Sequence, residues 1–276
     1  MLIQPLDREA LRRQFSSATP FPFVIIDNFL DPGFAEAVAN AYPSYELATQ
    51  QGLTFKTVNE KKKVQITDSK RFPEPVKKLS DALAAPSLLA ELSYITGFPK
   101  LLADPALIGG GIHITGPGGR LDVHVDFNYF ENTKLYRRAN LIVYLNPHWE
   151  KSWGGQLQLW DRDVTRCEHE FEPRFNRCVI FETSDTGFHG VRPVSEEAPF
   201  PRQSFAVYYY TLEAPPAWAG VHDSIFRARP DEKVKGYVLM PAEAIGRKLR
   251  DGTKRIKTDI KRLLGISSFR QLLQKH

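Results

Sequence analysis

The chain has 276 residues, 42% of them hydrophobic and 25% charged, a composition typical of a globular protein long enough to bury a full core. No apolar run approaches the roughly 20 residues of a membrane-spanning helix, and the N-terminus carries acids and arginines where a signal peptide would be apolar. Cys167 and Cys178 are the only cysteines. They could pair across a hairpin, but they are too few for a disulfide scaffold and favour a reducing, cytoplasmic location.

The net charge of +5 is concentrated near the C-terminus. Residues 247–262 hold eight Lys or Arg against two Asp, so the rest of the chain sums to about −1. This distribution argues against a fold built around nucleic acid. Within 245–262 apolar residues recur at helical spacing, which favours the solvated face of a packed helix. Contact with RNA, a ribosome or an anionic membrane is the alternative.

The first hundred residues predict a mixture of strands and helices. The apolar, β-branched run 21–30 predicts a buried strand. Asp31 and Pro32 then have the residue types of an N-cap and a first helical position, so a helix is expected to follow. The polar stretch 46–63 predicts a long loop with short strands. Residues 73–96 predict two helices.

From Leu107 onward the pattern changes to short strands separated by Gly, Pro and Asn turns. Polar and apolar residues alternate clearly at 156–160 and 204–208. Five or more such segments without long helices between them predict an antiparallel barrel or sandwich. After Pro215 no further strand is expected, and the pattern becomes helical.

The segment His124-Val-Asp126 carries two metal-ligand side chains at positions i and i+2, which lie on one face of a strand. His189, 65 residues after His124, is the candidate third ligand. Two imidazoles and one carboxylate form a facial triad that leaves coordination positions open and suits non-haem Fe(II) oxygenases. Taken alone, such a pair is also common among surface polar groups. A closed zinc site is disfavoured because the cysteines lie apart from these histidines.

Arg202 begins an alternating strand, with Ser204 on the same face. A 2-oxo diacid needs a cation at its far carboxylate, and arginine offers a planar, bidentate fork to which Ser204 could add a hydroxyl. A strand-edge arginine paired with a glutamate is the alternative. The rival cation, Arg192, is expected at the mouth of the site, where it would touch substrate. His113 is either a core histidine, which we favour, or a co-substrate contact.

Residues 107–212 resemble the prolyl-hydroxylase-like branch of the Fe(II)/2-oxoglutarate dioxygenases. The matching motifs are, in order, HVD, RRANLIVYLNPHW, SWGGQLQLW, PRFNRCVIFET, HGVRPV and RQSFAVYYY. The resemblance implies a mainly β protein with flanking helices, in which N-terminal helices pack outside a double-stranded β-helix (jelly-roll) core. It implies an oxygenase domain over 1–215, comprising a lead-in at 1–106 and the core at 107–215. A basic helical extension at 216–276 would follow.

The resemblance also implies roles for single residues. His124, Asp126 and His189 would ligate iron, and Arg202 would bind the distal carboxylate of 2-oxoglutarate. Tyr144 would hydrogen-bond the same carboxylate. Other positions implied or suggested to face the co-substrate are Asn140, Ser204 and His113.

The activity implied is hydroxylation of an unactivated C–H bond with release of succinate and CO2. Fe(II) and 2-oxoglutarate would be required, and ascorbate is a candidate reductant. Asp126 favours hydroxylation, because related halogenases carry a small residue at that position. The implied substrate, besides dioxygen, is an amino acid, a prolyl residue or a peptide-like small molecule. A non-catalytic jelly-roll binding module and a cupin-type metal enzyme are the alternatives.

Aromatic and basic residues follow the HxD pair and are candidates for a lid or a substrate wall, with ordinary loop packing as the alternative. They are Phe127, Tyr129, Phe130, Tyr136, Arg137 and Arg138. A substrate carboxylate held by either arginine would indicate a free acid or amino acid.

Overall fold

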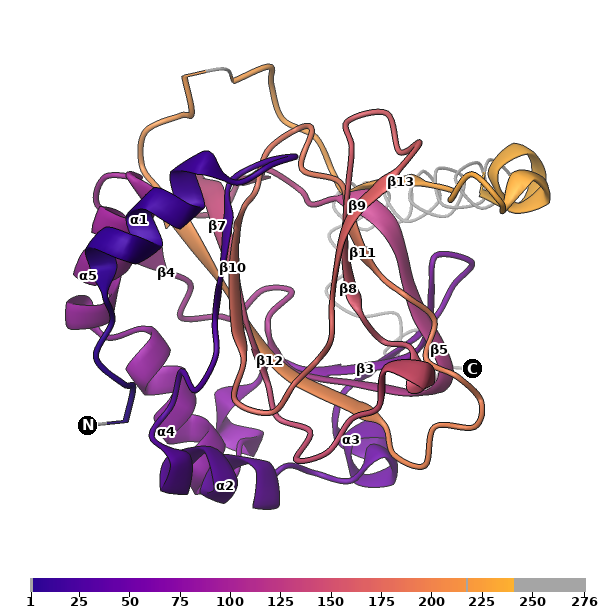
Figure 1. Cartoon of the computed structure of the whole chain (residues 1–276), viewed down its shortest axis with the longest axis horizontal. Helices are drawn as coiled ribbons and strands as arrows, with labels where there is room; N and C mark the ends of the chain where they lie inside the picture. Colours follow the sequence, from indigo (N-terminus) through magenta and orange to yellow (C-terminus); the bar gives the residue numbers. More distant parts are fainter. Residues whose placement is uncertain (1, 217, 241–276) are drawn as a thin grey trace, which may run out of the picture. The chain divides into compact units, whose positions relative to one another are not determined.

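The computed structural model describes residues 2–216 and 218–240, and the chain divides into two compact units, Met1–Pro230 and Asp231–His276 (Figure 1). The first unit therefore extends fifteen residues beyond the boundary expected at residue 215. In the second unit, the π-helix η3 spans Lys235–Leu239, and Lys235 pairs with Glu232 at 2.9 Å. The basic run and the helical stretches expected after residue 240 lie outside the described residues.

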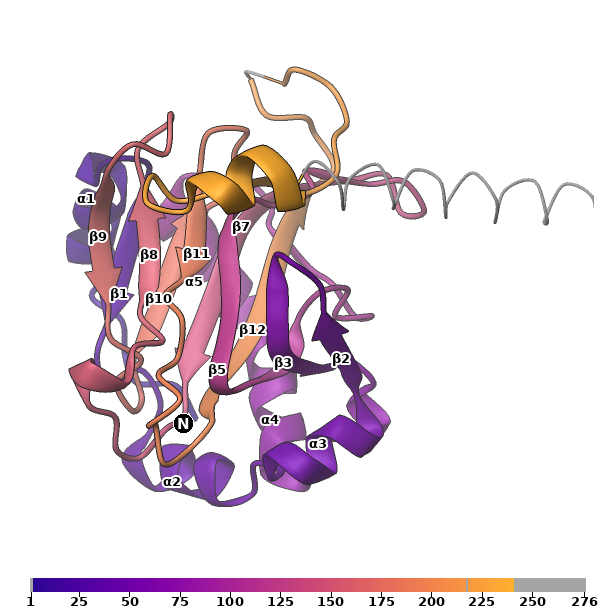
Figure 2. The ribbon, with the colours of Figure 1, turned by 90° about the vertical axis from the view of Figure 1, so that its right-hand side faces the viewer.

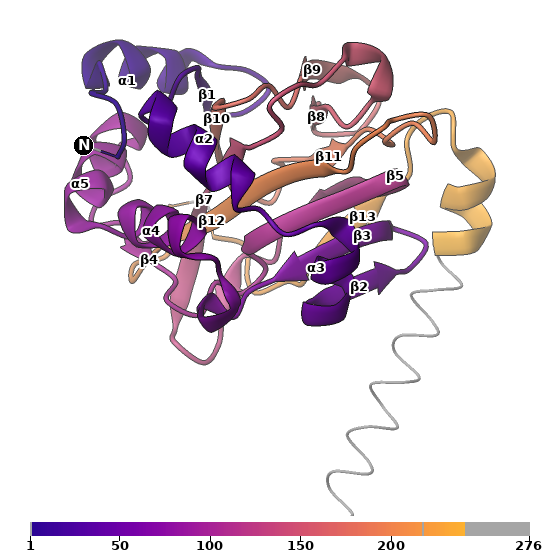
Figure 3. The same cartoon turned by 90° about the horizontal axis from the view of Figure 1, so that it is seen from below.

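The α-helices of the described chain all precede residue 97 and pack on one side of the β-sheet (Figures 1 and 3). They are α1 (Arg8–Ser17), α2 (Pro32–Asn40), α3 (Tyr45–Gln51), α4 (Glu74–Leu83) and α5 (Pro86–Thr96). The expected cap of α2 is confirmed, since the Asp31 side chain accepts a hydrogen bond from the Phe34 N–H at 3.0 Å. No described helix has the length and apolarity to cross a lipid bilayer.

The strands form one curled antiparallel sheet, which confirms the expected mainly β, jelly-roll class. They are β1 (Phe23–Ile26), β2 (Leu53–Lys56), β3 (Glu60–Ile66), β4 (Leu102–Ala103), β5 (Gly111–Val125), β6 (Tyr129–Phe130), β7 (Leu135–Tyr144), β8 (Leu157–Trp160), β9 (Cys167–Phe171), β10 (Cys178–Glu182), β11 (His189–Val191), β12 (Arg202–Thr211) and β13 (Ile225–Arg227). The main order is β1-β10-β7-β12-β5-β11-β8-β9.

Strand β5 joins the two layers of the curled sheet (Figure 2). Its first residues, 111–115, pair with β12, whereas Leu121 and His124 pair with β11 in the opposite layer. The space between the layers is therefore lined by the inward-facing residues of β5, β7, β8, β11 and β12. One strand thus spans both layers and carries His124 at its far end.

Two expectations were wrong about local structure. Residues 46–63 have the expected short strands, β2 and the start of β3, but the rest of the expected loop forms most of the helix α3. The physical reason is the cap of α3, where the Ser44 hydroxyl accepts a hydrogen bond from the Leu47 N–H at 3.2 Å. After Pro215 a further strand, β13, pairs with β5. Cys167 and Cys178 are both free thiols.

The main apolar core fills the space between the helices and the outer face of the β7, β10 and β12 layer. Helix residues such as Leu79 and Leu92 are buried there together with Leu141, Phe205 and Val207 of the strands. A second buried cluster, including Tyr144, Leu159 and Phe181, lies on the inner face. Alternation along each strand therefore assigns one set of side chains to the core and the other to the interior of the curled sheet.

Candidate functional site

The structure brings His124, Asp126 and His189 together between the two layers. His124 and His189 are register partners on the antiparallel strands β5 and β11, and their rings lie 4.4 Å apart. Nε2 of each histidine lies 3.4 Å from a carboxylate oxygen of Asp126. One ligand atom from each residue falls within 4.8 Å of the others, and all three residues are buried. This arrangement can hold a metal ion with positions left open.

Backbone carbonyls orient both imidazoles. Nδ1–H of His124 donates to the Asp122 carbonyl at 2.9 Å, and Nδ1–H of His189 donates to the Gly187 carbonyl at 3.0 Å. Each Nε2 is therefore unprotonated and available as a ligand. Burial, reinforced by His124, lowers the pKa of His189 to about 4, so this imidazole is neutral at physiological pH, as metal binding requires.

Asp126 is held by two side chains of β7. Its Oδ2 accepts hydrogen bonds from Arg137 Nη2 at 3.0 Å and from Asn140 Nδ2 at 2.8 Å. Burial alone would raise the pKa of Asp126, but the charge of Arg137 outweighs it and holds that pKa well below its usual value. The carboxylate is therefore ionised; its Oδ1 lies 3.4 Å from His124 Nε2 and its Oδ2 lies 3.4 Å from His189 Nε2.

Both arginines after the HxD pair are buried and have partners within the protein, so their role as substrate contacts stays a prediction. Arg137 is only 2% exposed, and its guanidinium lies 3.5 Å from the Tyr208 ring while it bonds Asp126. Arg138 bonds Thr211 and lies 4.2 Å from the Phe98 ring, against the helical core. The pattern of charges in the sequence could not show this, because the partners of both arginines come from distant segments.

Arg202 is a buried cation without a counter-ion. It is 4% exposed, and no carboxylate of the described residues lies within ion-pair distance of it, which excludes the expected alternative of a glutamate-paired arginine at the strand edge. Its Nε donates to the Gly155 carbonyl at 2.7 Å and its Nη1 to Ser204 Oγ at 3.2 Å. Nη2 makes no hydrogen bond within the described chain. A buried guanidinium in this state is suited to an anionic ligand.

Tyr144 adds an unsatisfied hydroxyl to the same end of the site. The guanidinium carbon of Arg202 lies 5.0 Å from the Tyr144 ring, and the buried Tyr144 hydroxyl has no hydrogen bond of normal geometry to a described residue. Burial raises the pKa of Tyr144, so the hydroxyl is a neutral donor. Gly155 allows the approach of Arg202, since it has φ 74° and a Cβ there would lie 3.0 Å from Arg202 Cδ.

His113 and Asn140 line the same interior. His113 lies opposite Ser204 in the sheet register, and its Nε2–H donates to the Gly109 carbonyl at 2.9 Å. Burial lowers the pKa of His113 well below its usual value, so it is a neutral, satisfied histidine, in agreement with the core interpretation. Asn140 accepts a hydrogen bond from Thr183 as well as from Arg137. It therefore belongs to the Asp126 network at the metal end.

Two residues of the site escaped the sequence interpretation. Tyr208 lies against Arg137, and the alternation that begins at Arg202 could have predicted its inward position. Phe226 stacks on the His124 ring with centroids 5.0 Å apart and an angle of 23°. Nothing local in the sequence signals this contact, because it depends on the pairing of β13 with β5.

The mouth of the site is aromatic. Tyr129, Tyr136 and Trp218 form a cluster with ring centroids 4.8 to 6.0 Å apart. Phe127 lies 4.7 Å from the Arg137 guanidinium. Arg192, expected here, instead pairs with Glu170 of β9 at 3.3 Å and is exposed. The expected contact between Arg192 and a substrate stays a prediction.

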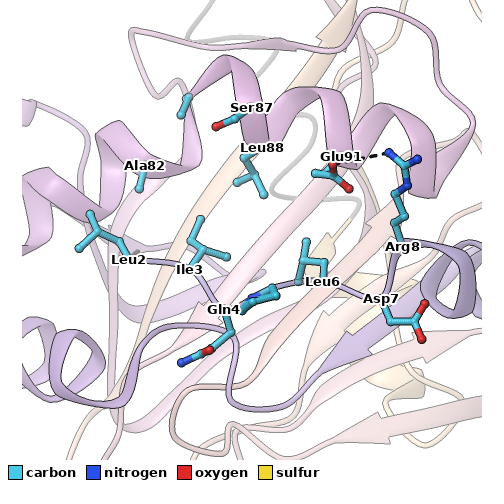
Figure 4. Close-up of a pocket in the computed structure, with 12 residues that line it drawn as sticks. Leu2, Ile3, Gln4, Leu6, Asp7, Arg8, Ala82, Ser87, Leu88 and Glu91 are labelled. Carbon is cyan, nitrogen blue, oxygen red and sulfur yellow. Dashed lines mark ion pairs between the residues drawn. The ribbon is translucent and has the colours of Figure 1, made fainter.

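A separate groove of about 690 Å³ lies between the N-terminal segment and the α4–α5 region (Figure 4). Leu2, Ile3 and Leu6 face Leu88 across it, and the Arg8–Glu91 ion pair of 3.7 Å closes one end. It shares no residue with the metal site. Its lining is mostly apolar with a single ion pair, so it lacks the cluster of acid, base or metal-binding side chains that catalysis needs.

Comparisons with known proteins agree with this geometry. The family described as the 2OG-Fe(II) oxygenase superfamily matches residues 110–210. The chain is similar to prolyl 3-hydroxylase OGFOD1 of Mus musculus, with 37% identity over 89 residues, and to that of Xenopus laevis, with 36% over 86 residues. These matches cover 30% and 29% of this chain but only 16% and 17% of the relatives. The chain thus matches a small part of those longer proteins.

The fold is also similar to that of a solved prolyl hydroxylase from Trichoplax adhaerens, crystallised with a hypoxia inducible factor peptide fragment. The TM-score is 0.53 at 19% identity, over 74% of this chain and 88% of the other. Proteins of the matched superfamily use Fe(II) and 2-oxoglutarate, and the His124, Asp126 and His189 triad fits such a metal. Residues 110–210 of the chain are therefore similar to the 2OG-Fe(II) oxygenase superfamily, and the fold is similar to that of a prolyl hydroxylase.

Proposed function

We propose that the protein is a 2-oxoglutarate-dependent hydroxylase that oxidises an unactivated C–H bond and releases succinate and CO2. In this proposal His124, Asp126 and His189 ligate Fe(II), while Arg202, Tyr144 and Ser204 bind the distal carboxylate of 2-oxoglutarate. The observation that carries it is the buried, uncompensated guanidinium of Arg202 in the same interior as the triad. An anion placed there would remove the desolvation cost of that charge.

The bound metal and 2-oxo acid would supply the oxidising power, and the protein would orient and enclose them. Arg202 and Tyr144 fix one end of the co-substrate, and Ser204 holds the guanidinium in place. Ala206, the small inward residue between Ser204 and Tyr208, leaves room beside the β7 wall for a carbon chain. Asn140 and Arg137 keep the Asp126 carboxylate ionised and turned to the metal.

The two alternative functions have less support. A non-catalytic binding module has no use for an ionised carboxylate and two imidazoles placed at ligand distance. A cupin-type metal enzyme has no use for the buried arginine. Cytoplasmic location and the absence of nucleic-acid or membrane contact stay predictions from the sequence.

The experiment is an anaerobic titration of the metal-free protein with Fe(II) and then 2-oxoglutarate. We expect the weak visible charge-transfer band of a 2-oxo acid chelated to Fe(II). The band should be lost in His124→Ala. In Arg202→Ala a much higher concentration of 2-oxoglutarate should be needed to produce it. An absent band with iron demonstrably bound would remove the 2-oxoglutarate assignment and leave the cupin-type alternative.

A further inference from the structure

Apart from Arg202, which the proposed function assigns to 2-oxoglutarate, the three arginines suggested as substrate contacts all have partners within the protein. Arg137 bonds Asp126, and Arg138 bonds Thr211. Arg192 pairs with Glu170. A small acid at the metal centre would therefore have to displace an existing partner to find a guanidinium in this set. This weighs against a free acid as the substrate.

A groove with the opposite charge opens next to the metal ligands. It has a volume of about 380 Å³, and its walls include Phe127, Phe130 and Val221. Its acidic residues are Glu131 and Asp223, and no lysine or arginine of the described chain lines it. The groove therefore offers apolar surface with negative charge beside it.

Phe127 brings the groove close to the metal site, because it lines the groove and is the neighbour of a metal ligand in the chain. This residue directly follows Asp126, and its ring lies 4.7 Å from the guanidinium that bonds the Asp126 carboxylate. A chain lying in the groove would thus have a residue within reach of the metal while its neighbours occupied the walls. Such an extended ligand is a polypeptide segment and not a single amino acid.

The far wall of the groove is held in place by hydrogen bonds. Nδ2 of Asn128 donates to the Gly220 carbonyl at 2.9 Å, and its Oδ1 accepts from the His222 N–H at 3.0 Å. The His222 ring is engaged with Asp185 at 2.8 Å. Val221 between these contacts is 58% exposed, and Ile108, which also lines the groove, is 38% exposed. Fixed, exposed apolar side chains of this kind mark a binding surface.

We propose that this groove binds a protein segment in which a large apolar side chain lies next to lysine or arginine, so that the enzyme hydroxylates a basic stretch of polypeptide. The apolar walls would bury the apolar side chain, and Glu131 and Asp223 would attract the cations. The inference rests on the proposed function for its statement about hydroxylation. The binding preference itself can be tested without turnover.

The test uses the full chain loaded with Mn(II) and 2-oxoglutarate, with fluorescence anisotropy as the readout. The probes are two fluorescein-labelled nonapeptides that share the core Gly-Leu-Pro-Phe-Gly. One peptide has two lysines on each side of the core, and the other has two glutamates on each side. We expect the lysine peptide to bind about tenfold more tightly at low salt, where exposed charges are least screened. The double variant Glu131→Lys with Asp223→Lys should abolish this preference.

A matched control carries Glu36→Lys with Asp81→Lys, two exposed acids on α2 and α4 whose replacement changes the net charge equally. It should keep the preference for the lysine peptide. Equal binding of both peptides, no binding of either, or an equal loss in the control would overturn the inference. The anaerobic Fe(II) and 2-oxoglutarate titration on the same preparation separates the cases. A visible band without a peptide preference removes only the inference, whereas a preference without a band removes the proposed function.

Discussion

The Arg137 guanidinium donates to Oδ2 of Asp126 at 3.0 Å inside a site where both side chains are buried. The same guanidinium donates to Oδ1 of Asn140. Nδ2 of Asn140 in turn donates to Oδ2 of Asp126 at 2.8 Å. Three side chains thus form a closed network around Oδ2 of Asp126, the carboxylate oxygen that lies 3.4 Å from Nε2 of His189. This network orients the carboxylate and fixes its charge.

We expect Arg137→Leu to weaken Mn(II) binding by about 10- to 100-fold, because partners that orient a ligand carry effects of that size. Arg137→Lys should recover part of the affinity, since a lysine keeps the charge but loses the second hydrogen bond. Isothermal titration of the metal-free variants with Mn(II) measures both. Arg138→Leu is the matched control, because Arg138 is also buried, at 7% exposed, but bonds Thr211 and not Asp126. If the two leucine variants lost equal affinity, the role of Arg137 would be general stability.

Tyr144→Phe should weaken 2-oxoglutarate binding by about tenfold without lowering the free energy of unfolding. The hydroxyl has no hydrogen bond of normal geometry to a described residue, and an unsatisfied buried polar group costs about 1–3 kcal/mol, whereas a bond to a carboxylate stabilises the complex. Tyr209→Phe behaves oppositely, because the Tyr209 hydroxyl donates to the Leu83 carbonyl at 2.9 Å on the helical side. Urea denaturation and anaerobic titration of both variants check the pair. A Tyr144→Phe protein that binds 2-oxoglutarate normally would remove Tyr144 from the site.

Phe226→Ala should weaken metal binding severalfold, because the Phe226 ring restrains the His124 imidazole on which it stacks. Ile225→Ala is the control, since Ile225 is the preceding residue of β13 and is exposed. Competition between the protein and a fluorescent chelator for Co(II) measures both variants. Equal metal affinities of the Phe226→Ala and Ile225→Ala proteins would show that the stacking on His124 contributes nothing to metal binding.

The Asp27–Arg177 ion pair should give a pH-dependent contribution to stability. The side-chain hydrogen bond from Arg177, at 2.6 Å from Nε to Oδ1, lowers the pKa of Asp27 in the folded protein. Stability from this group is therefore complete above its unfolded pKa of about 4 and is lost as the pH falls through the lower folded value. Asp27 is half exposed, so Asp27→Asn should cost only about 0.5–1 kcal/mol at pH 7.

Urea denaturation of both proteins from pH 7 down to pH 3 tests this expectation. The difference in the free energy of unfolding should shrink as the pH falls. Asp81→Asn, at an exposed position of α4, should show no such trend. A difference for Asp27→Asn that stayed constant with pH would contradict the assignment to the ion pair.

Local spacing predicted much of the candidate site. The i, i+2 spacing of His124 and Asp126 puts them on one face, and the structure places them together with His189. The same rule placed Ser204 beside Arg202, where the two bond at 3.2 Å. The structure also explains one glycine of the pair before β8: the absence of a Cβ at Gly155 lets the Arg202 side chain approach the backbone. These features depend on periodicity and residue type, which a sequence carries directly.

Other features depended on contacts between distant segments. From the sequence, Arg137 and Arg138 were equally good candidates for substrate contacts. The fold places Arg137 against Asp126 and Arg138 against Phe98. The strand β13 lies beyond the last expected strand, yet it pairs with β5 at His124. The stretch 46–63 had the composition of a loop, but a capped helix and a hairpin form there.

The sequence by itself determined the donor set of the metal site, the curled β architecture and the cation expected at the co-substrate, because each follows from residue type and strand periodicity. Only the tertiary structure decided which charges are already satisfied. Arg202 lacks a counter-ion and Arg137 has one because β12 and β7 pair in a register that carries Arg137, and not Arg202, to Asp126. The free or bound state of a charge depends on its neighbours in space, and those neighbours are set by strand register and loop closure over long distances in the chain.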